Sequence, residues 1–129
     1  MKTTGKYILD TEGNPVEVTD LMEWAEWFET SKEKRVVAKT KLKNVTVSTV
    51  FLGLDHNWDN LFGHKGKRRG KPLLYETMVF ENKITTEDVM GSPLKFYKSL
   101  DDYSERYHDK KEAGAGHHEI VKRLIINKI

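Results

Sequence analysis

The sequence predicts an α+β fold in which an antiparallel β-meander of three to four strands packs with an N-terminal and a C-terminal helix. Three observations predict it. Residues 45–54 and 72–80 are rich in β-branched and aromatic side chains, residues 20–29 and 109–125 carry apolar side chains at helical spacing, and turn-forming residues separate these segments. A length of 129 residues suits a single domain, residues 1–129, with one modest core.

The N-terminal segment predicts a short hairpin, or a strand and an extended arm, followed by a helix. Residues 6–10 and 15–18 flank the turn-forming residues 11–14, and Asp20 with Glu23 three positions later resembles a capping box. The expected apolar stripe of the helix consists of Leu21, Trp24, Ala25 and Phe28, with Trp27 beside it. We expect these aromatic rings to anchor the core or an interface, and the alternative is a stacking platform for a base.

The middle of the chain predicts the centre of the sheet. Residues 35–42 and 45–54 form a hairpin around Lys43-Asn44, and the second strand is apolar on both faces toward its end, which favours a central strand covered by a helix. Residues 72–80 form the next strand. Glu76 stands there between Leu74 and Met78 on the face that we expect to be buried, so its carboxylate needs a partner or a pocket.

The C-terminal third begins with a weak pattern, residues 81–102. Gly91-Ser92-Pro93 interrupts it, and the spacing of Leu94, Tyr97 and Leu100 suggests a short helical turn. Residues 103–108 suggest an edge strand, and Asp109 caps a final helix. The apolar stripe of that helix consists of Ala113, His117, Ile120, Val121, Leu124 and Ile125. Its glycines, Gly114 and Gly116, either weaken the first turns or let another group approach closely.

Composition excludes several classes of function. The chain has no cysteine, which rules out disulfides, thiolate catalysis and cysteine-based zinc sites. A net charge of +2 is too balanced to indicate nucleic acid by itself. No run approaches the roughly 20 apolar residues of a membrane span, and no signal-peptide core follows the first residues. We therefore expect a cytoplasmic protein with no membrane partner, no cofactor and no metal.

Four polar residues form the first candidate site: Asp55, His56, Glu76 and His117. A histidine beside a carboxylate can act as a general base, and two histidines with carboxylates can hold a divalent metal. Simpler interpretations stand beside this one. His117 can be a core histidine satisfied by backbone or by Glu76, Glu76 a hydrogen-bonded buried acid, and Asp55 a turn former. No complete catalytic motif accompanies these residues.

Two further groups of residues predict anion binding. Residues 64–71 form a basic loop whose candidate phosphate-binding residues are Lys65, Lys67, Arg68 and Arg69, with a solvated loop as the alternative. Arg106 and Tyr107, together with His56 and Trp24 or Trp58, predict a pocket for an anionic aromatic ligand. The alternative for this pair is that Tyr107 packs in the core and Arg106 lies on the surface.

The chain resembles a family of small uncharacterised phage and prophage proteins. The resemblance rests on six segments: residues 15–29, residues 35–38, residues 45–56 with VSTVFLGLDH, PLLYETMVF at 72–80, residues 105–107, and EAGAGH at 112–117. Residues 58–69 and 83–98 depart from the pattern and look like added material. The resemblance implies an accessory protein acting in the cytoplasm of an infected cell, and it implies no activity.

These observations favour a non-enzymatic phage accessory protein that binds a host component. The expected partner is a nucleotide-like signal or a host defence protein, which would make the protein a means of evading host defence. One alternative is a small metal-dependent hydrolase that uses His56, Glu76 and His117. Another is a nucleic-acid-binding module built on loop 64–71. We also expect a homo-oligomer, because one small domain has three tryptophans and a strand with two apolar faces to cover.

Overall fold

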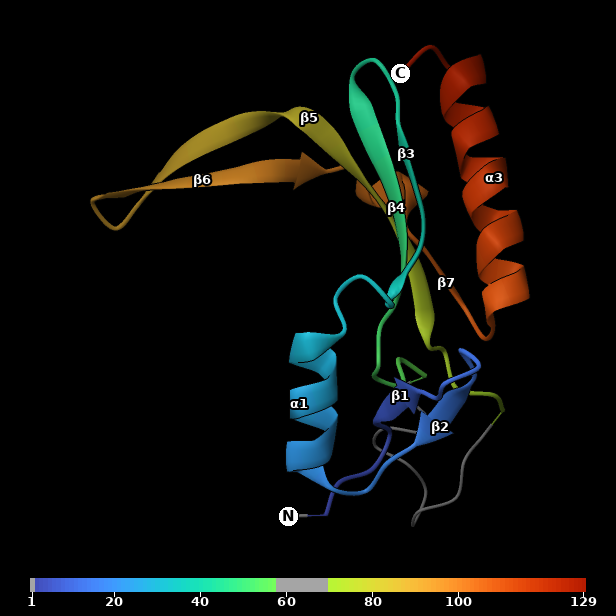
Figure 1. Ribbon diagram of the computed structural model, residues 1–129. Helices are drawn as coiled ribbons and strands as arrows, with labels where there is room; N and C mark the ends of the chain where they lie inside the picture. The colour runs from blue at the N-terminus through green and yellow to red at the C-terminus, as the bar shows by residue number, and fades with distance from the viewer. Residues whose placement is uncertain (1, 58–69) are drawn as a thin grey trace.

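The computed structural model describes residues 2–57 and 70–129. A curled antiparallel sheet of five strands forms a half-barrel; its strand order is β3-β4-β5-β6, and β7 pairs with β5. Helix α3 lies along one face of the sheet, while α1 and the small β1-β2 hairpin lie at one end (Figure 1). The elements are β1 (Tyr7–Leu9), β2 (Pro15–Glu17), α1 (Leu21–Thr30), β3 (Val36–Lys41), β4 (Val45–Phe51), β5 (Tyr75–Val89), β6 (Ser92–Ser99), the 3-10 turn η2 (Asp101–Tyr103), β7 (Glu105–Tyr107) and α3 (Lys110–Ile126).

The α+β class, the two terminal helices and the N-terminal hairpin are confirmed. No helix among the described residues has the length and apolar content of a transmembrane span. Helix α1 begins as predicted, because the side chain of Asp20 accepts a hydrogen bond from the Met22 amide at 3.0 Å. Aromatic rings hold the helix against β4 and the residues that follow it, and the ring of Trp27 packs edge-on against Phe51 of β4 with centroids 5.8 Å apart. Trp24 stacks on Phe28 with ring centroids 4.9 Å apart and donates through Nε1 to the Gly53 carbonyl at 2.9 Å.

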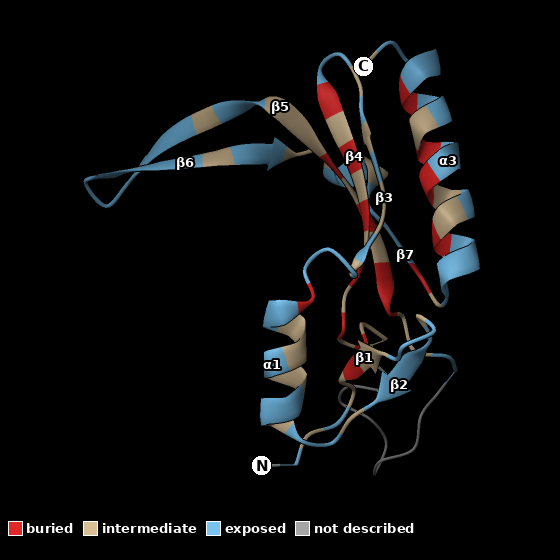
Figure 2. Cartoon of the chain, in the orientation of Figure 1, coloured by how far each residue is buried: buried red, intermediate tan, exposed pale blue. Residues whose placement is uncertain are grey.

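Strand β4 is the centre of the sheet, as predicted. It pairs with β3 on one side and β5 on the other, and the β3-β4 turn closes at Lys43-Asn44 with the Leu42 amide donating to the Val45 carbonyl at 2.8 Å. Side chains alternate along β4 between buried and half-buried. The buried ones are Val45, Val47, Thr49 and Phe51, and the side of α3 that faces them carries Ala113, His117, Ile120 and Leu124 (Figure 2).

The prediction that Glu76 faces the helix is wrong. In β5 the buried side chains are Tyr75, Thr77 and Val79, so Glu76 lies with Met78 on the opposite face. Both faces of this strand are apolar enough to be buried, so alternation alone cannot choose between them. On the buried face the Thr77 hydroxyl is hydrogen-bonded to Thr49 and Tyr107. A buried threonine is satisfied there, which explains why Thr77 and not Glu76 faces the helix.

The expected helical turn at residues 94–100 is also wrong. These residues lie mostly in β6, which pairs with the distal half of β5, and the two strands turn at Met90 and Gly91, whose φ angles are +52° and +86°. The hairpin extends away from the rest of the molecule as an arm (Figure 1). It raises the sheet from the expected three or four strands to five. Backbone pairing with β5 outweighs the helical spacing of three apolar side chains.

Helix α3 and β7 confirm the predicted C-terminal helix and edge strand, but the inclusion of Ile125 in the buried stripe is wrong, because Ile125 is 60% exposed. The side chain of Asp109 accepts from the Glu112 amide at 2.8 Å and caps the helix. Strand β7 pairs with β5 from Tyr75↔Tyr107 to Thr77↔Glu105. Gly116 permits the close approach that its position suggested, because a Cβ atom there would overlap the ring of Tyr107. The Tyr107 ring is thereby locked between the sheet and the helix.

Candidate functional site

The side chains in the first candidate site do not converge, because His117 lies on the buried face of the sheet. Its Nδ1 is 2.7 Å from Thr49 Oγ1 and its Nε2 is 2.8 Å from Thr40 Oγ1. Thr49 Oγ1 is in turn 2.5 Å from Thr77 Oγ1, which accepts from the Tyr107 hydroxyl at 3.0 Å. These five residues form the helix-side network. Threonines, and not Glu76 or the backbone, satisfy the imidazole.

A neutral imidazole fits the helix-side network, in which the hydroxyl hydrogens of Tyr107, Thr77 and Thr49 are each donated to the next member. Burial lowers the pKa of His117, and the charge of His118 lowers it further. Neutral histidine has one donor and one acceptor nitrogen. In the arrangement that we assign, Tyr107 donates to Thr77, Thr77 to Thr49, Thr49 to Nδ1, and Nε2–H to Thr40. With both nitrogens engaged and the side chain 6% exposed, His117 has a structural role.

Asp55 is a turn former, as its simplest interpretation predicted. Its Oδ1 accepts from the Asn57 amide at 2.9 Å and from the Leu73 amide at 3.0 Å, and the residue is 1% exposed. It thus ties the chain leaving β4 to the chain entering β5. Its Oδ2 is buried without a hydrogen-bond partner among the described residues.

His56, Glu76 and Arg106 lie together at the rim of the sheet. Arg106 Nε donates to Glu76 Oε2 at 2.8 Å across the β5-β7 pair. Burial, followed by the charge of Arg106, lowers the pKa of His56, while the charges of Glu76 and Asp55 oppose this shift. Tyr107 does not join Arg106 in a pocket, because neighbouring residues of a strand point to opposite faces. Burial raises the pKa of the Tyr107 hydroxyl, which is in the helix-side network.

The basic loop is left as a prediction. Its candidate phosphate-binding residues, Lys65, Lys67, Arg68 and Arg69, fall within 58–69 and so lie outside the described residues, as does Trp58. Within the described ranges, 2–57 and 70–129, no three His, Asp or Glu side chains gather in an arrangement that could hold a metal ion.

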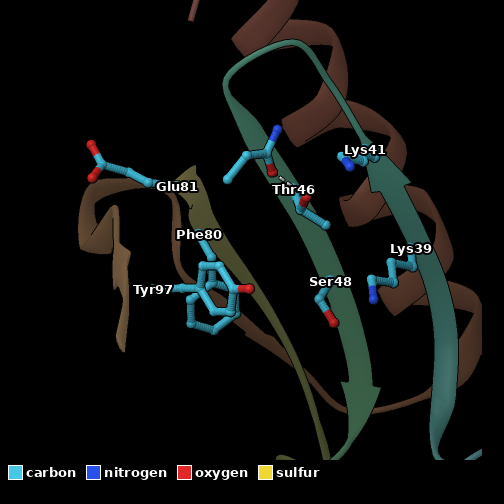
Figure 3. A pocket seen from close by; sticks show the side chains of 8 residues that line it. Lys39, Lys41, Thr46, Ser48, Phe80, Glu81 and Tyr97 are labelled. Atoms are coloured by element: carbon cyan, nitrogen blue, oxygen red, sulfur yellow. Dashed lines mark hydrogen bonds between the residues drawn. The ribbon is translucent and has the colours of Figure 1, made fainter. Parts of the chain in front are cut away.

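A groove of about 440 Å³ lies on the face of the sheet opposite α3, where the arm leaves the sheet. We call it the open-face groove. Phe80 and Tyr97 lie together on one side of it, Lys39 and Lys41 lie on the other, and Ser48 lies between them (Figure 3). Its full lining is Lys39, Lys41, Thr46, Ser48, Phe80, Glu81, Asn82 and Tyr97. Its size falls within the range of small-molecule sites.

Strand register builds this groove. Lys39 pairs with Ser48 and Lys41 with Thr46, so two ammonium groups and two hydroxyls share one face across the hairpin. Thr46 donates to Asn82 Oδ1 at 2.5 Å, and Asn82 Nδ2 donates to the Leu42 carbonyl at 2.9 Å, which fixes the base of the arm. Within the described part of the chain, neither lysine forms a salt bridge. Both ammonium groups are therefore available to a ligand.

Sequence reasoning missed the open-face groove, although part of its signal was present. Lys39 and Lys41 alternate with half-buried positions, and Thr46 and Ser48 alternate with buried ones. Their symmetric placement about Lys43-Asn44 puts the two pairs side by side. Tyr97 could not be included, because the spacing of its segment predicts a helical turn.

No family model, curated protein or solved structure matches this chain. The chemistry of the open-face groove and of the rim residues is therefore the basis for assigning a function.

Proposed function

We propose that this protein is a non-enzymatic accessory protein, of phage or prophage origin, that binds a host nucleotide-like signal in the open-face groove. The observation that supports this most directly is the groove's composition. Two lysines, two hydroxyls and two aromatic rings surround one cavity of about 440 Å³. This is the chemistry that an anionic ligand with a planar ring requires.

The two sides of the groove bind different parts of such a ligand. The ammonium groups of Lys39 and Lys41 attract a phosphate, and the hydroxyl of Ser48 can donate a hydrogen bond to one of its oxygens. Tyr97 is 54% exposed, so its ring is open to stacking against a base.

The sides of the groove set the orientation of a bound nucleotide. Glu81 lines the cavity, but its carboxylate points away from it (Figure 3). The Asn82 amide is already hydrogen-bonded to Thr46 and to the Leu42 carbonyl. A nucleotide with its base on Tyr97 and its phosphate directed toward the lysines is therefore the favoured ligand.

The hydrolase alternative loses its geometric support. It requires His56, Glu76 and His117 around one substrate, but Glu76 and His117 belong to opposite faces of the sheet. The nucleic-acid alternative rests on residues 64–71, most of which lie outside the described ranges, and it stays a prediction.

Isothermal calorimetry with a nucleotide panel tests the proposal. The panel contains adenosine and guanosine monophosphates, 3′,5′-cyclic mononucleotides and cyclic dinucleotides, with inorganic phosphate as the charge-only control and adenosine as the ring-only control. We expect a nucleotide to bind more tightly than either control. Replacing both groove lysines, Lys39→Ala with Lys41→Ala, is expected to weaken binding at least tenfold, and Tyr97→Ala is expected to weaken it by a similar factor.

Lys95→Ala is the matched control, because Lys95 is exposed on β6 and outside the groove lining. It should leave nucleotide affinity unchanged. Silence across the whole panel would refute the nucleotide ligand. Pull-down from host lysate with wild-type and Lys39→Ala/Lys41→Ala protein then examines the other expected partner, a host defence protein. Silence in both experiments would refute the accessory binding role.

A further inference from the structure

The distal half of β5 has one edge that no other described strand covers. Its pairing with β4 ends at Val45↔Glu81, and the Asn82 amide still donates to the Asn44 carbonyl at 2.9 Å. From Ile84 to Val89 the strand pairs only with β6, after an irregularity in register between Phe80 and Ile84. Figure 1 shows this part of β5 extending beyond the sheet. Its backbone groups on the open side are therefore free to pair with another strand.

The arm also exposes apolar side chains on both of its faces. Cross-strand partners share a face, which places Ile84 with Tyr97 and Glu87 with Leu94. Ile84, Leu94 and Tyr97 are 55%, 51% and 54% exposed. An isolated two-stranded hairpin is only marginally stable in water. The arm thus has both a free backbone edge and apolar surface for a further strand to cover.

The two edges of the arm differ in how readily they can pair with a further strand. The outer edge, β6, carries Pro93, Lys95 and Lys98, the residue types with which proteins block edge pairing. The free edge of β5 has no proline and places Ile84, Thr85 and Thr86 in succession, all β-branched. Pairing is therefore directed to β5.

We propose that two copies of this chain form a homodimer by antiparallel pairing of their β5 edges, with the two-fold axis at Thr85. This register places Lys83 of each copy opposite Glu87 of the other. The strand is self-complementary in charge, which identifies the occupant of the free edge as a second copy.

Symmetry and charge together select this register. A two-fold axis perpendicular to a sheet keeps each side chain on its face, so only residues an even number of positions apart can oppose each other. Centring the axis on Thr86 places Asp88 opposite Ile84 and forms no ion pair. Centring it on Glu87 brings the two Glu87 carboxylates together. Only the Thr85 centre forms two Lys–Glu pairs among these registers.

Sedimentation velocity with the full chain tests the dimer. We expect a concentration-dependent dimer for the wild type. Lys83→Glu and Glu87→Lys each create like-charge pairs twice in the interface, so each variant should raise the dimer Kd about tenfold. Lys95→Glu, on the blocked β6 edge, is the matched control and should leave the Kd unchanged.

A mixture of the two variants separates a lost contact from a lost fold. In an equimolar mixture the glutamate introduced at position 83 of one variant faces the lysine introduced at position 87 of the other. The native Lys83 and Glu87 that the variants retain face each other in the same way, so a heterodimer should form with about the wild-type affinity. A wild type that is monomeric at every concentration, single variants that dimerise normally, or a mixture that stays monomeric would each overturn the proposal. Lys83 and Glu87 lie outside the groove lining, so nucleotide binding is tested separately.

Discussion

The two faces of the central sheet carry similar polar residues in opposite circumstances. On the helix side, Thr49 and His117 are buried and engaged in the helix-side network. On the other side, Ser48 and Lys39, which are cross-strand neighbours, line a groove that no helix of the described residues covers. A covered face must satisfy its polar groups internally, whereas an open face can offer them to a ligand.

Because of this contrast, substitutions of neighbouring residues should have different effects. Thr49 and Ser48 are adjacent in the same strand, yet only the loss of Thr49 would leave buried polar atoms without partners. Substitutions on the helix side should therefore change the free energy of unfolding. Substitutions on the open face should change ligand affinity and leave folding nearly unaffected.

The largest expected effect comes from the tightest contact on the helix side. Gly116→Ala drives a methyl group into the Tyr107 ring and should lower the free energy of unfolding by about 3 kcal/mol. Gly114→Ala is the matched control, because nothing lies within 4 Å of a Cβ there. Alanine stabilises a helix interior by about 0.5–1 kcal/mol relative to glycine, so this variant should gain stability. Urea unfolding of both variants measures the difference, and equal effects would contradict the close packing of Tyr107.

The next effect concerns adjacent residues of β4. Thr49→Val keeps the side-chain shape but leaves His117 Nδ1 and the Thr77 hydroxyl without their shared partner, at a cost of about 1–3 kcal/mol. Ser48→Ala should change stability by less than about 0.5 kcal/mol. The same unfolding experiment compares them. A Ser48→Ala loss as large as that of Thr49→Val would remove the distinction between the faces.

Acid should weaken the helix side through His117. Its pKa is lower in the folded protein than in the unfolded chain, so the unfolded state binds more protons and stability falls as pH drops below about 6.5. The loss is complete below the folded-state pKa. His117→Gln keeps hydrogen-bonding groups without titrating, and its stability should fall less between about pH 7.5 and pH 5. Identical pH profiles for the two proteins would exclude His117 as the source, leaving His56, whose pKa is also lowered.

The smallest effect belongs to the rim of the sheet. Arg106 is 42% exposed, so its ion pair with Glu76 is screened by solvent, and Arg106→Ala should cost about 0.5 kcal/mol. Arg106→Lys retains the charge and serves as the control. Thermal unfolding at low and high salt measures both. A loss above about 2 kcal/mol for Arg106→Ala would place the pair in the folding core instead.

Local patterns are sufficient to predict much of the fold. Asp20 and Asp109 cap their helices because a cap depends only on the next few amides, and Lys43-Asn44 closes its hairpin for a similarly local reason. A close approach at Gly116 is one of the two outcomes that its position in the helix predicts. The turn-forming role of Asp55 also follows from its place at a strand end.

Long-range pairing decides what local patterns cannot. Leu94, Tyr97 and Leu100 have helical spacing, yet the partner strand β5 makes most of this segment a strand. Glu76 and Thr77 exchange their expected faces because both faces of β5 are apolar. The open-face groove is lined by Tyr97 of the arm on one side and Lys39 of β3 on the other. These residues are far apart in the chain, so no single segment predicts the groove.

The most direct test of the division between the two faces is a titration of ¹⁵N-labelled protein with the nucleotide that binds most tightly in calorimetry, followed by amide chemical shifts. Ligand binding in the open-face groove predicts perturbations centred on Lys39, Lys41, Ser48 and Tyr97, with Ala113, His117 and Ile120 of α3 nearly unchanged. Perturbations centred on α3, or on the rim residues His56 and Arg106, would contradict the assignment of the ligand to the open-face groove.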